Sequence, residues 1–224
     1  RSSAASDVYK RQVLIMTIVN LESPFLSRSE KEKERAAKRQ AVLLAAVKIF
    51  NSRGFHSTSL DDVAQSLGIS KPTIYHYLGN KEQVLLTCVE EGLNQLIASA
   101  EEISKRNITG YERLREFLYV YGCRNLDDFG RCVILTSDDS LSPEGLVQFK
   151  ALKKKVQEVL LSIIESAIDD KSIDNQYDPK ILAFTLTGAI NWSAKWYSDN
   201  GKKTKEETVK EMIEILTHGI MPNK

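Results

Sequence analysis

The chain has 224 residues, 42% of them hydrophobic and 27% charged, and its few Gly (11) and Pro (5) favour a globular protein of long helices over a many-turned sheet. Its net charge is only +1, but residues 30–81 hold nine Lys and Arg against five Asp and Glu, whereas residues 82–224 hold 18 against 23, which fits a polyanion-binding head on an acidic body. The three Cys and three His are scattered without zinc-ligand spacing, so no structural zinc site is predicted, and the odd number of Cys favours reduced thiols in a cytoplasm over a disulfide framework.

The first 29 residues are predicted to lie outside the fold. Residues 13–19 form an apolar or neutral run of only seven residues, far below the roughly 18 needed to span a bilayer, and no Ala-x-Ala cleavage site follows it. We therefore expect no membrane anchor. Residues 1–15 are interpreted as a leader foreign to the native protein, with Met16 as the native start and a disordered N-terminus up to residue 29.

The first helix is predicted over residues 36–53. Residues 30–39 are strongly charged, and a solvated, frayed helix start is the favoured interpretation of that run. An apolar stripe with i, i+3, i+4, i+7 spacing follows: Leu43, Ala46, Val47 and Phe50. Gly54 is expected to end this helix as its C-cap.

The next apolar stripe predicts a short second helix. Thr58 and Ser59 offer N-cap oxygens, and each has an Asp three residues further on, as in a capping box. The apolar residues again repeat at helical spacing: Leu60, Val63, Ala64 and Leu67. Gly68 ends this helix after two turns, so residues 68–70 are expected to form a tight turn.

A third helix, residues 71–78, is predicted directly after that turn, because Ser70 can cap it and Pro72 lies in its first turn, where a missing N–H costs nothing. Two short helices joined by such a turn form a helix-turn-helix, whose second helix enters the DNA major groove. Its exposed side chains mix a cation, a hydroxyl and amphipathic aromatics, the groups that bind phosphates and base edges. They are Lys71, Thr73, Tyr75, His76 and Tyr77. Packing of the tyrosines into the core is the alternative for each single residue.

Residues 43–85 closely resemble, without a gap, the DNA-binding domain of the TetR family of repressors; they read LLAAVKIFNSRGFHSTSLDDVAQSLGISKPTIYHYLGNKEQVL. The resemblance implies that residues 30–80 form a DNA-binding domain. Carried over by position, it implies DNA contacts from eight residues: Thr58, Ser70, Lys71, Thr73, Tyr75, His76, Tyr77 and Lys81. The operator sequence does not carry over, because base-reading residues vary between family members.

Residues 81–224 are predicted to form an all-helical second domain, so the expected fold class is all-α. A long helix beginning near residue 81 carries an apolar stripe: Leu85, Val89, Leu93 and Leu96. Further helices are predicted at residues 111–123, 126–137, 143–169, 179–198 and 205–219. The resemblance implies that this domain binds a small molecule and forms the dimer.

The last two predicted helices carry broad apolar faces. On one face lie Ile181, Phe184, Thr185, Gly188 and Trp192, and on the other Val209, Met212, Ile213, Leu216 and Ile220. In the TetR family such a pair forms a four-helix bundle with the same pair of a second subunit, so the resemblance implies a homodimer. The alternative is that both stripes belong to the core of a monomer.

Two segments resemble a TetR subfamily with members that respond to acyl-CoA thioesters; they read FGRCVILTSDDSLSPEGLVQFKALKKKV and LTGAINWSAKWYSDNGKKTKEE. The resemblance points to an acyl-CoA as the effector. An aromatic pocket would suit its acyl chain, and cations would suit its phosphates. The predicted ligand-binding residues are Arg131, Phe149, Phe184, Trp192 and Trp196, with further cations at Lys153, Lys154, Lys155 and Lys195. An ordinary aromatic core and a solvated lysine face are the alternatives.

No GxSxG, P-loop, paired-carboxylate or metal-ligand motif occurs, so neither an enzyme nor a cofactor is predicted. The remaining alternative is a helical adaptor or sensor without specific DNA binding. The presence of Lys71, Tyr75 and Lys81 together argues against it. The sequence thus predicts a transcriptional regulator, most simply a repressor that a small hydrophobic effector releases from a palindromic operator.

Overall fold

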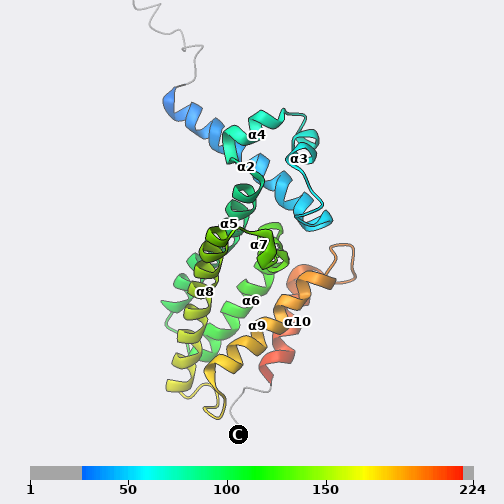
Figure 1. Ribbon diagram of the computed structural model, residues 1–224. Helices are drawn as coiled ribbons and strands as arrows, with labels where there is room; N and C mark the ends of the chain where they lie inside the picture. The colour runs from blue at the N-terminus through cyan, green and yellow to red at the C-terminus, as the bar shows by residue number, and fades with distance from the viewer. Residues whose placement is uncertain (1–26, 219–224) are drawn as a thin grey trace, which may run out of the picture. The chain divides into compact units, whose positions relative to one another are not determined.

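The structure is a computed structural model that describes residues 27–218. The predicted leader, the N-terminus up to residue 26 and the end of the last predicted helix, with Ile220, lie outside the described residues. Within residues 27–218 there are nine α-helices, one 3-10 turn and no strand, which confirms the all-α prediction (Figure 1). No helix in this range is both long and apolar enough to cross a bilayer. The described residues divide into two compact units, with the boundary between residues 39 and 40.

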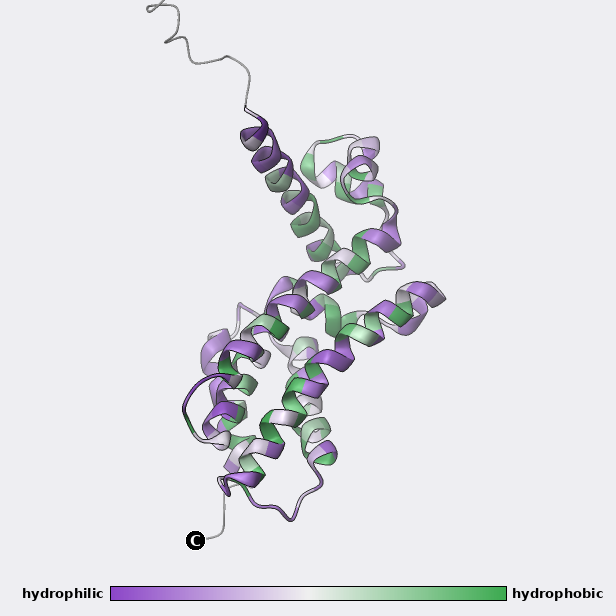
Figure 2. Ribbon diagram, turned by 90° about the vertical axis from the view of Figure 1, so that its left-hand side faces the viewer, coloured by the Kyte–Doolittle hydropathy of each residue, from purple (hydrophilic) through white to green (hydrophobic). Residues whose placement is uncertain are grey.

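Helix α2 (Arg28–Arg53) begins eight residues before the predicted start. Ser27 caps it, because the Ser27 hydroxyl accepts from the Glu30 N–H at 3.2 Å and the Glu30 carboxylate accepts from the Ser27 N–H at 2.7 Å. An ion pair between Arg28 and Glu32, four residues apart, adds to this. The charged run over residues 30–39, interpreted as a frayed helix start, is therefore helical, exposed and strongly hydrophilic (Figure 2).

Within the second unit, the remainder of α2 packs with α3 (Leu60–Leu67) and α4 (Lys71–Leu78) around the predicted apolar stripes. Leu43, Val63 and Ile74 are fully buried, one from each helix. Two short helices on one longer helix therefore form the helix-turn-helix that the spacing predicts.

The rest of this unit consists of longer packed helices. They are α5 (Lys81–Ser104), α6 (Gly110–Leu126), α7 (Asp128–Leu135), η1 (Asp138–Ser140), α8 (Pro143–Asp169), α9 (Pro179–Trp196) and α10 (Lys205–His218). Helix α5 packs against α6, α7 and α8, and α6 packs against α8, α9 and α10. The helix predicted over residues 126–137 is wrong at its start, because α6 continues to Leu126 and an extended Asp127 separates it from α7.

The two apolar faces predicted for a subunit interface differ in their exposure. On α9, Ile181, Phe184 and Trp192 are exposed in the protomer. On α10, Val209 and Ile213 are buried and belong to the protomer core, since α10 packs against α6. The monomer-core alternative therefore holds for these two residues of α10, and the face of α9 remains uncovered.

Candidate nucleic-acid interface and effector cavity

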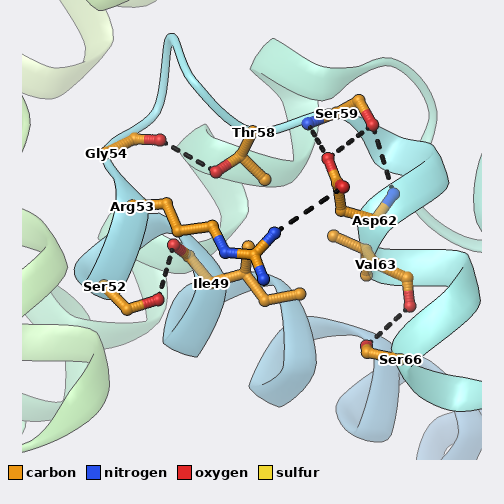
Figure 3. Close-up of polar contacts among 9 residues, drawn as sticks. All are labelled: Ile49, Ser52, Arg53, Gly54, Thr58, Ser59, Asp62, Val63 and Ser66. Atoms are coloured by element: carbon orange, nitrogen blue, oxygen red, sulfur yellow. Dashed lines mark hydrogen bonds and ion pairs between the residues drawn. The ribbon is translucent and has the colours of Figure 1, made fainter.

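Ser59 fixes the start of α3. Its hydroxyl accepts from the Asp62 N–H at 3.2 Å, and the Asp62 carboxylate accepts from the Ser59 N–H at 2.7 Å and from the Ser59 hydroxyl at 2.6 Å (Figure 3). Hydrogen bonds from the Ser59 side chain and backbone lower the pKa of Asp62. The predicted capping box is thus confirmed at Ser59. Thr58 is buried instead, and its hydroxyl donates to the Gly54 carbonyl oxygen at 2.8 Å.

The turn between α3 and α4 begins at Gly68, as predicted. Its φ of 64° lies in the left-handed region that favours glycine, and its N–H closes the end of α3. Ser70 occupies the N-cap position of α4, but its side chain does not cap the helix as predicted, because its hydroxyl pairs with the Thr73 hydroxyl at 2.9 Å. Pro72 lies in the first turn, as expected.

Helix α4 presents one polar face to solvent. Ile74 and Leu78 are buried on its inner side, and Tyr77 packs partly against the core. On the outer side His76 is exposed and Tyr75 is 47% exposed. An exposed aromatic of this size is available to a ligand rather than needed by the core.

The two lysines predicted to contact DNA, Lys71 and Lys81, have partners within the protein. The Lys71 ammonium lies 2.7 Å from the Asp61 carboxylate, and this hydrogen bond raises the pKa of Lys71. The Lys81 ammonium lies 4.2 Å from the centre of the Phe55 ring, and burial lowers the pKa of Lys81. Tyr75 and Lys81 line the same open depression. The structure thus brings these two predicted contacts together.

A cavity of about 320 Å³ lies among helices α5 to α9. Its apolar wall comes from α5, α7 and α8 and includes Leu93, Leu96, Val133, Val156 and Leu160. Its polar side chains come from α6, α8 and α9 and include Tyr121, Arg124, Asn125, Lys153, Gln157 and Asn191. Both charged side chains that line it are cations, so the cavity suits an apolar ligand with a polar or anionic end.

The predicted ligand-binding aromatics do not converge on this cavity. Phe184 lines it. Phe149 is buried in the core, with the Lys153 ammonium 5.0 Å from the centre of its ring. Trp192 and Trp196 are 66% and 50% exposed and lie outside the lining.

Arg131, the predicted phosphate-binding cation, is already hydrogen-bonded to backbone carbonyl groups at the end of α9. Its guanidinium donates to the carbonyl oxygens of Ala194, at 2.9 Å, and Tyr197, at 2.8 Å. A cation at this position satisfies carbonyl groups that a helix end leaves without partners. The role that the structure supports for Arg131 is therefore to hold the end of α9.

Sequence reasoning missed the polar group at the cavity. The Tyr121 hydroxyl and the Asn125 amide both donate to the Asn191 side-chain oxygen, at 2.6 and 2.8 Å. The available signal was polar residues four apart on otherwise apolar helix stripes, since Tyr121 and Asn125 share a face of α6, and Thr187 and Asn191 share a face of α9.

Comparison with known proteins matches most of the chain. Residues 42–88 match a family model described as bacterial regulatory proteins, tetR family, and residues 107–220 match one described as tetracyclin repressor-like, C-terminal domain. The HTH-type transcriptional repressor KstR2 of Rhodococcus jostii (strain RHA1) is 23% identical over 190 residues, which are 83% of this chain and 92% of that protein.

Solved structures agree with this assignment. The TetR family transcriptional regulator PfmR from Thermus thermophilus superposes with a TM-score of 0.71 at 26% identity, covering 78% of this chain and 96% of that one. AibR, solved in complex with isovaleryl coenzyme A and operator DNA, gives a TM-score of 0.70 at 23% identity, covering 79% and 96%. The second similarity is one of fold.

Proposed function

This chain belongs to the TetR family of DNA-binding transcriptional regulators, and on that premise we propose that it is a homodimeric repressor that a small hydrophobic effector releases from a palindromic operator. In this proposal residues 30–80 bind DNA, residues 81–224 bind the effector and the second subunit, and the protein acts in the cytoplasm. The observation that carries the DNA-binding role is the outer face of α4, where hydroxyl, aromatic and imidazole groups face solvent.

The proposed DNA contacts are the predicted residues of α4 and its flanks: Ser70, Lys71, Thr73, Tyr75, His76, Tyr77 and Lys81. Thr58 has a different part. Its hydroxyl donates a hydrogen bond to the Gly54 carbonyl oxygen and so cannot also donate to a phosphate oxygen. Thr58 therefore positions the start of α3. Lys71 can reach a phosphate by leaving Asp61, an exposed pair whose net stabilisation is small.

We expect Tyr75→Ala and Lys81→Ala each to lower operator affinity about tenfold while the fold survives, because both side chains contribute contacts to DNA rather than to the core. Lys81→Ala should also reduce the slope of log affinity against log salt by about one unit. Operator titrations at several salt concentrations measure both effects. Lys154→Ala, an exposed lysine on α8, serves as the control with the same loss of charge. If both test variants bind like the parent at matched salt, the assigned interface is wrong.

The second subunit is proposed to cover the outer face of α9. Ile181, Phe184 and Trp192 are 67%, 59% and 66% exposed, and they share this face with Gly188. Contiguous exposed apolar side chains of this size mark an interaction surface. Ile215 of α10 is 71% exposed and is available to extend it. A two-fold dimer places two copies of α4 on two inverted half-sites, which is the reason to expect a palindromic operator.

The effector is proposed to be an acyl-CoA whose acyl group occupies the cavity. The cavity volume of about 320 Å³ is at the low end for small-molecule sites, so the nucleotide part would remain outside it. Apolar walls suit the chain and Lys153 suits an anion, whereas Arg124 already pairs with Asp127 at 3.7 Å and donates to the Gln95 side chain at 3.1 Å. Of the predicted ligand-binding residues, the proposal retains Phe184 and assigns Trp192 to the subunit interface. The complex of AibR with isovaleryl coenzyme A and operator DNA supports this choice by analogy.

The helices that wall the cavity also contact the DNA-binding helices. The Asn51 amide of α2 donates to the carbonyl oxygen of Asp128, the first residue of α7, at 2.8 Å. The Glu82 carboxylate of α5 accepts from the N–H of Ser142, which caps α8, at 2.6 Å. A ligand that moves α7 or α8 therefore acts directly on α2 and on the start of α5, as release of DNA requires.

We expect an acyl-CoA, of a chain length that the panel determines, to weaken operator binding about 5- to 150-fold. This is the range in which one ligand typically changes the affinity of a protein for another, about 5- to 150-fold. The measurement is operator affinity with and without acyl-CoAs, free fatty acids and free CoA. Free CoA is the control, because it retains the phosphates and lacks the acyl group. If thioesters bind no better than free CoA and leave operator affinity unchanged, the acyl-CoA assignment fails and the regulator responds to another effector.

A further inference from the structure

Two hydrogen bonds fix the orientation of the Asn191 side chain at the cavity. The Tyr121 hydroxyl and the Asn125 amide nitrogen converge on its Oδ1 atom, at 2.6 and 2.8 Å. With the Asn125 amide nitrogen donating as observed, turning the Asn191 amide over would set the two NH2 groups against each other, so the Asn191 oxygen faces α6. The Nδ2 atom then points away from this pair of donors.

The partners that hold Asn191 are themselves firmly placed. Tyr121 and Asn125 are 8% and 4% exposed, and burial raises the pKa of the Tyr121 hydroxyl, which therefore remains a proton donor at neutral pH. All three side chains line the cavity, and Asn191 is the partly exposed one. Within residues 27–218 the Asn191 Nδ2 hydrogens meet no protein acceptor. A positioned donor is thus available to a molecule in the cavity.

We propose that Asn191 Nδ2 donates a hydrogen bond to the carbonyl oxygen of the effector, and that the cavity thereby selects acyl groups over chains without a carbonyl. This inference rests on the acyl-CoA proposal. It adds the protein atom that binds the carbonyl oxygen of the acyl group. The two charged side chains that line the cavity, Arg124 and Lys153, are cations, which favours an acceptor as the polar end of the ligand. A ligand without that acceptor leaves a desolvated donor unpaired, which weakens binding about 10- to 100-fold.

The test compares an acyl-CoA thioester with the S-alkyl-CoA thioether of the same chain length, which differs by loss of the carbonyl oxygen. Dissociation constants are measured by calorimetry on the full-length protein. The parent should bind the thioester about 10- to 100-fold more tightly than the thioether. Asn191→Leu should reduce this preference, because leucine has a similar size and no donor, although it also leaves the Tyr121 and Asn125 donors without their acceptor.

Asn191→Asp covers the case in which the leucine variant fails to fold. An aspartate keeps an oxygen acceptor for Tyr121 and Asn125, but it replaces the Nδ2 donor by a second oxygen that repels a carbonyl. It should lower thioester affinity far more than thioether affinity. Thr187→Val, one turn earlier on the same wall, is the matched control and should keep the parent's preference.

The outcomes separate the inference from the proposal on which it rests. If a folded Asn191→Asp variant prefers the thioester by the same ratio as the parent, Asn191 does not bind the carbonyl, and the acyl-CoA proposal stands. If the parent binds thioester and thioether equally, the inference is again overturned. If neither molecule binds the parent, the acyl-CoA proposal is wrong and the inference falls with it.

Discussion

Trp192→Glu is expected to make the protein monomeric and to lower its operator affinity at least about 100-fold. Trp192 is 66% exposed in the protomer, so a carboxylate there remains solvated and the protomer should fold. In the proposed dimer the same carboxylate would be buried without a partner, which is strongly destabilising. A monomer carries one recognition helix and loses half of the operator contacts. Sedimentation and operator titrations at matched salt measure the two effects.

Val147→Glu is the control for this substitution. Val147 lies on α8, outside the proposed interface, and is 69% exposed. The substitution therefore introduces the same charge at a comparable exposed apolar position. This variant should remain dimeric and bind the operator like the parent. A Trp192→Glu variant that stays dimeric would show that the face of α9 is not the interface. If it also bound the operator but lost its response to the effector, Trp192 would belong to the effector site that the sequence predicted.

Gly110→Ala is expected to lower the free energy of unfolding by about 3 kcal/mol, at the upper end of typical overpacking costs. A Cβ atom at Gly110 would lie 2.3 Å from the Ala167 Cα atom and 2.5 Å from its nitrogen. These are backbone atoms of α8, so α6 and α8 must separate where they cross. Denaturant unfolding measures the change.

Gly188→Ala adds the same methyl group at a helical position where a Cβ atom meets nothing within 4 Å of the protomer. Because Gly188 lies on the proposed subunit interface, both glycine variants are compared in the Trp192→Glu background. Gly188→Ala should leave the free energy of unfolding within about 1 kcal/mol of the parent value. If the Gly110→Ala variant were as stable as the parent, α6 and α8 could move apart at this crossing without lowering the free energy of unfolding.

Most helices could be predicted because their signals are local. Apolar spacing and caps identified α3, α4 and α8 to within a residue. The early start of α2 was missed because it depends on the Ser27–Glu30 capping pair, which the charge of the segment obscured. The break between α6 and α7 was predicted at residues 124–125 but lies at Asp127, because no Gly or Pro marks its position.

The outer face of α4 could be predicted from helical periodicity, but its side-chain partners could not. The pairing of Lys71 with Asp61 joins two helices across a turn, and the position of Lys81 over Phe55 joins residues far apart in the chain. Such contacts depend on how helices pack and leave no periodic signal.

The residues that line the cavity were harder to predict than the face of α4, because composition does not say which side of α9 faces inward. Aromatic content drew attention to Trp192 and Trp196, which face outward, whereas the inward residue is Asn191, directly beside Trp192 in the chain. Arg131 offered a cation, but the carbonyl groups at the end of α9 occupy it.

The central claim is that two copies of this chain bind one two-fold symmetric DNA site. The most direct measurement is a footprint on DNA from upstream of its own gene, combined with light scattering of the protein alone. We expect a particle of twice the mass of one chain and protection of two inverted half-sites about one helical turn apart, or a multiple of it. A strict monomer, protection of a single asymmetric half-site, or binding no tighter than to unrelated DNA would contradict the account.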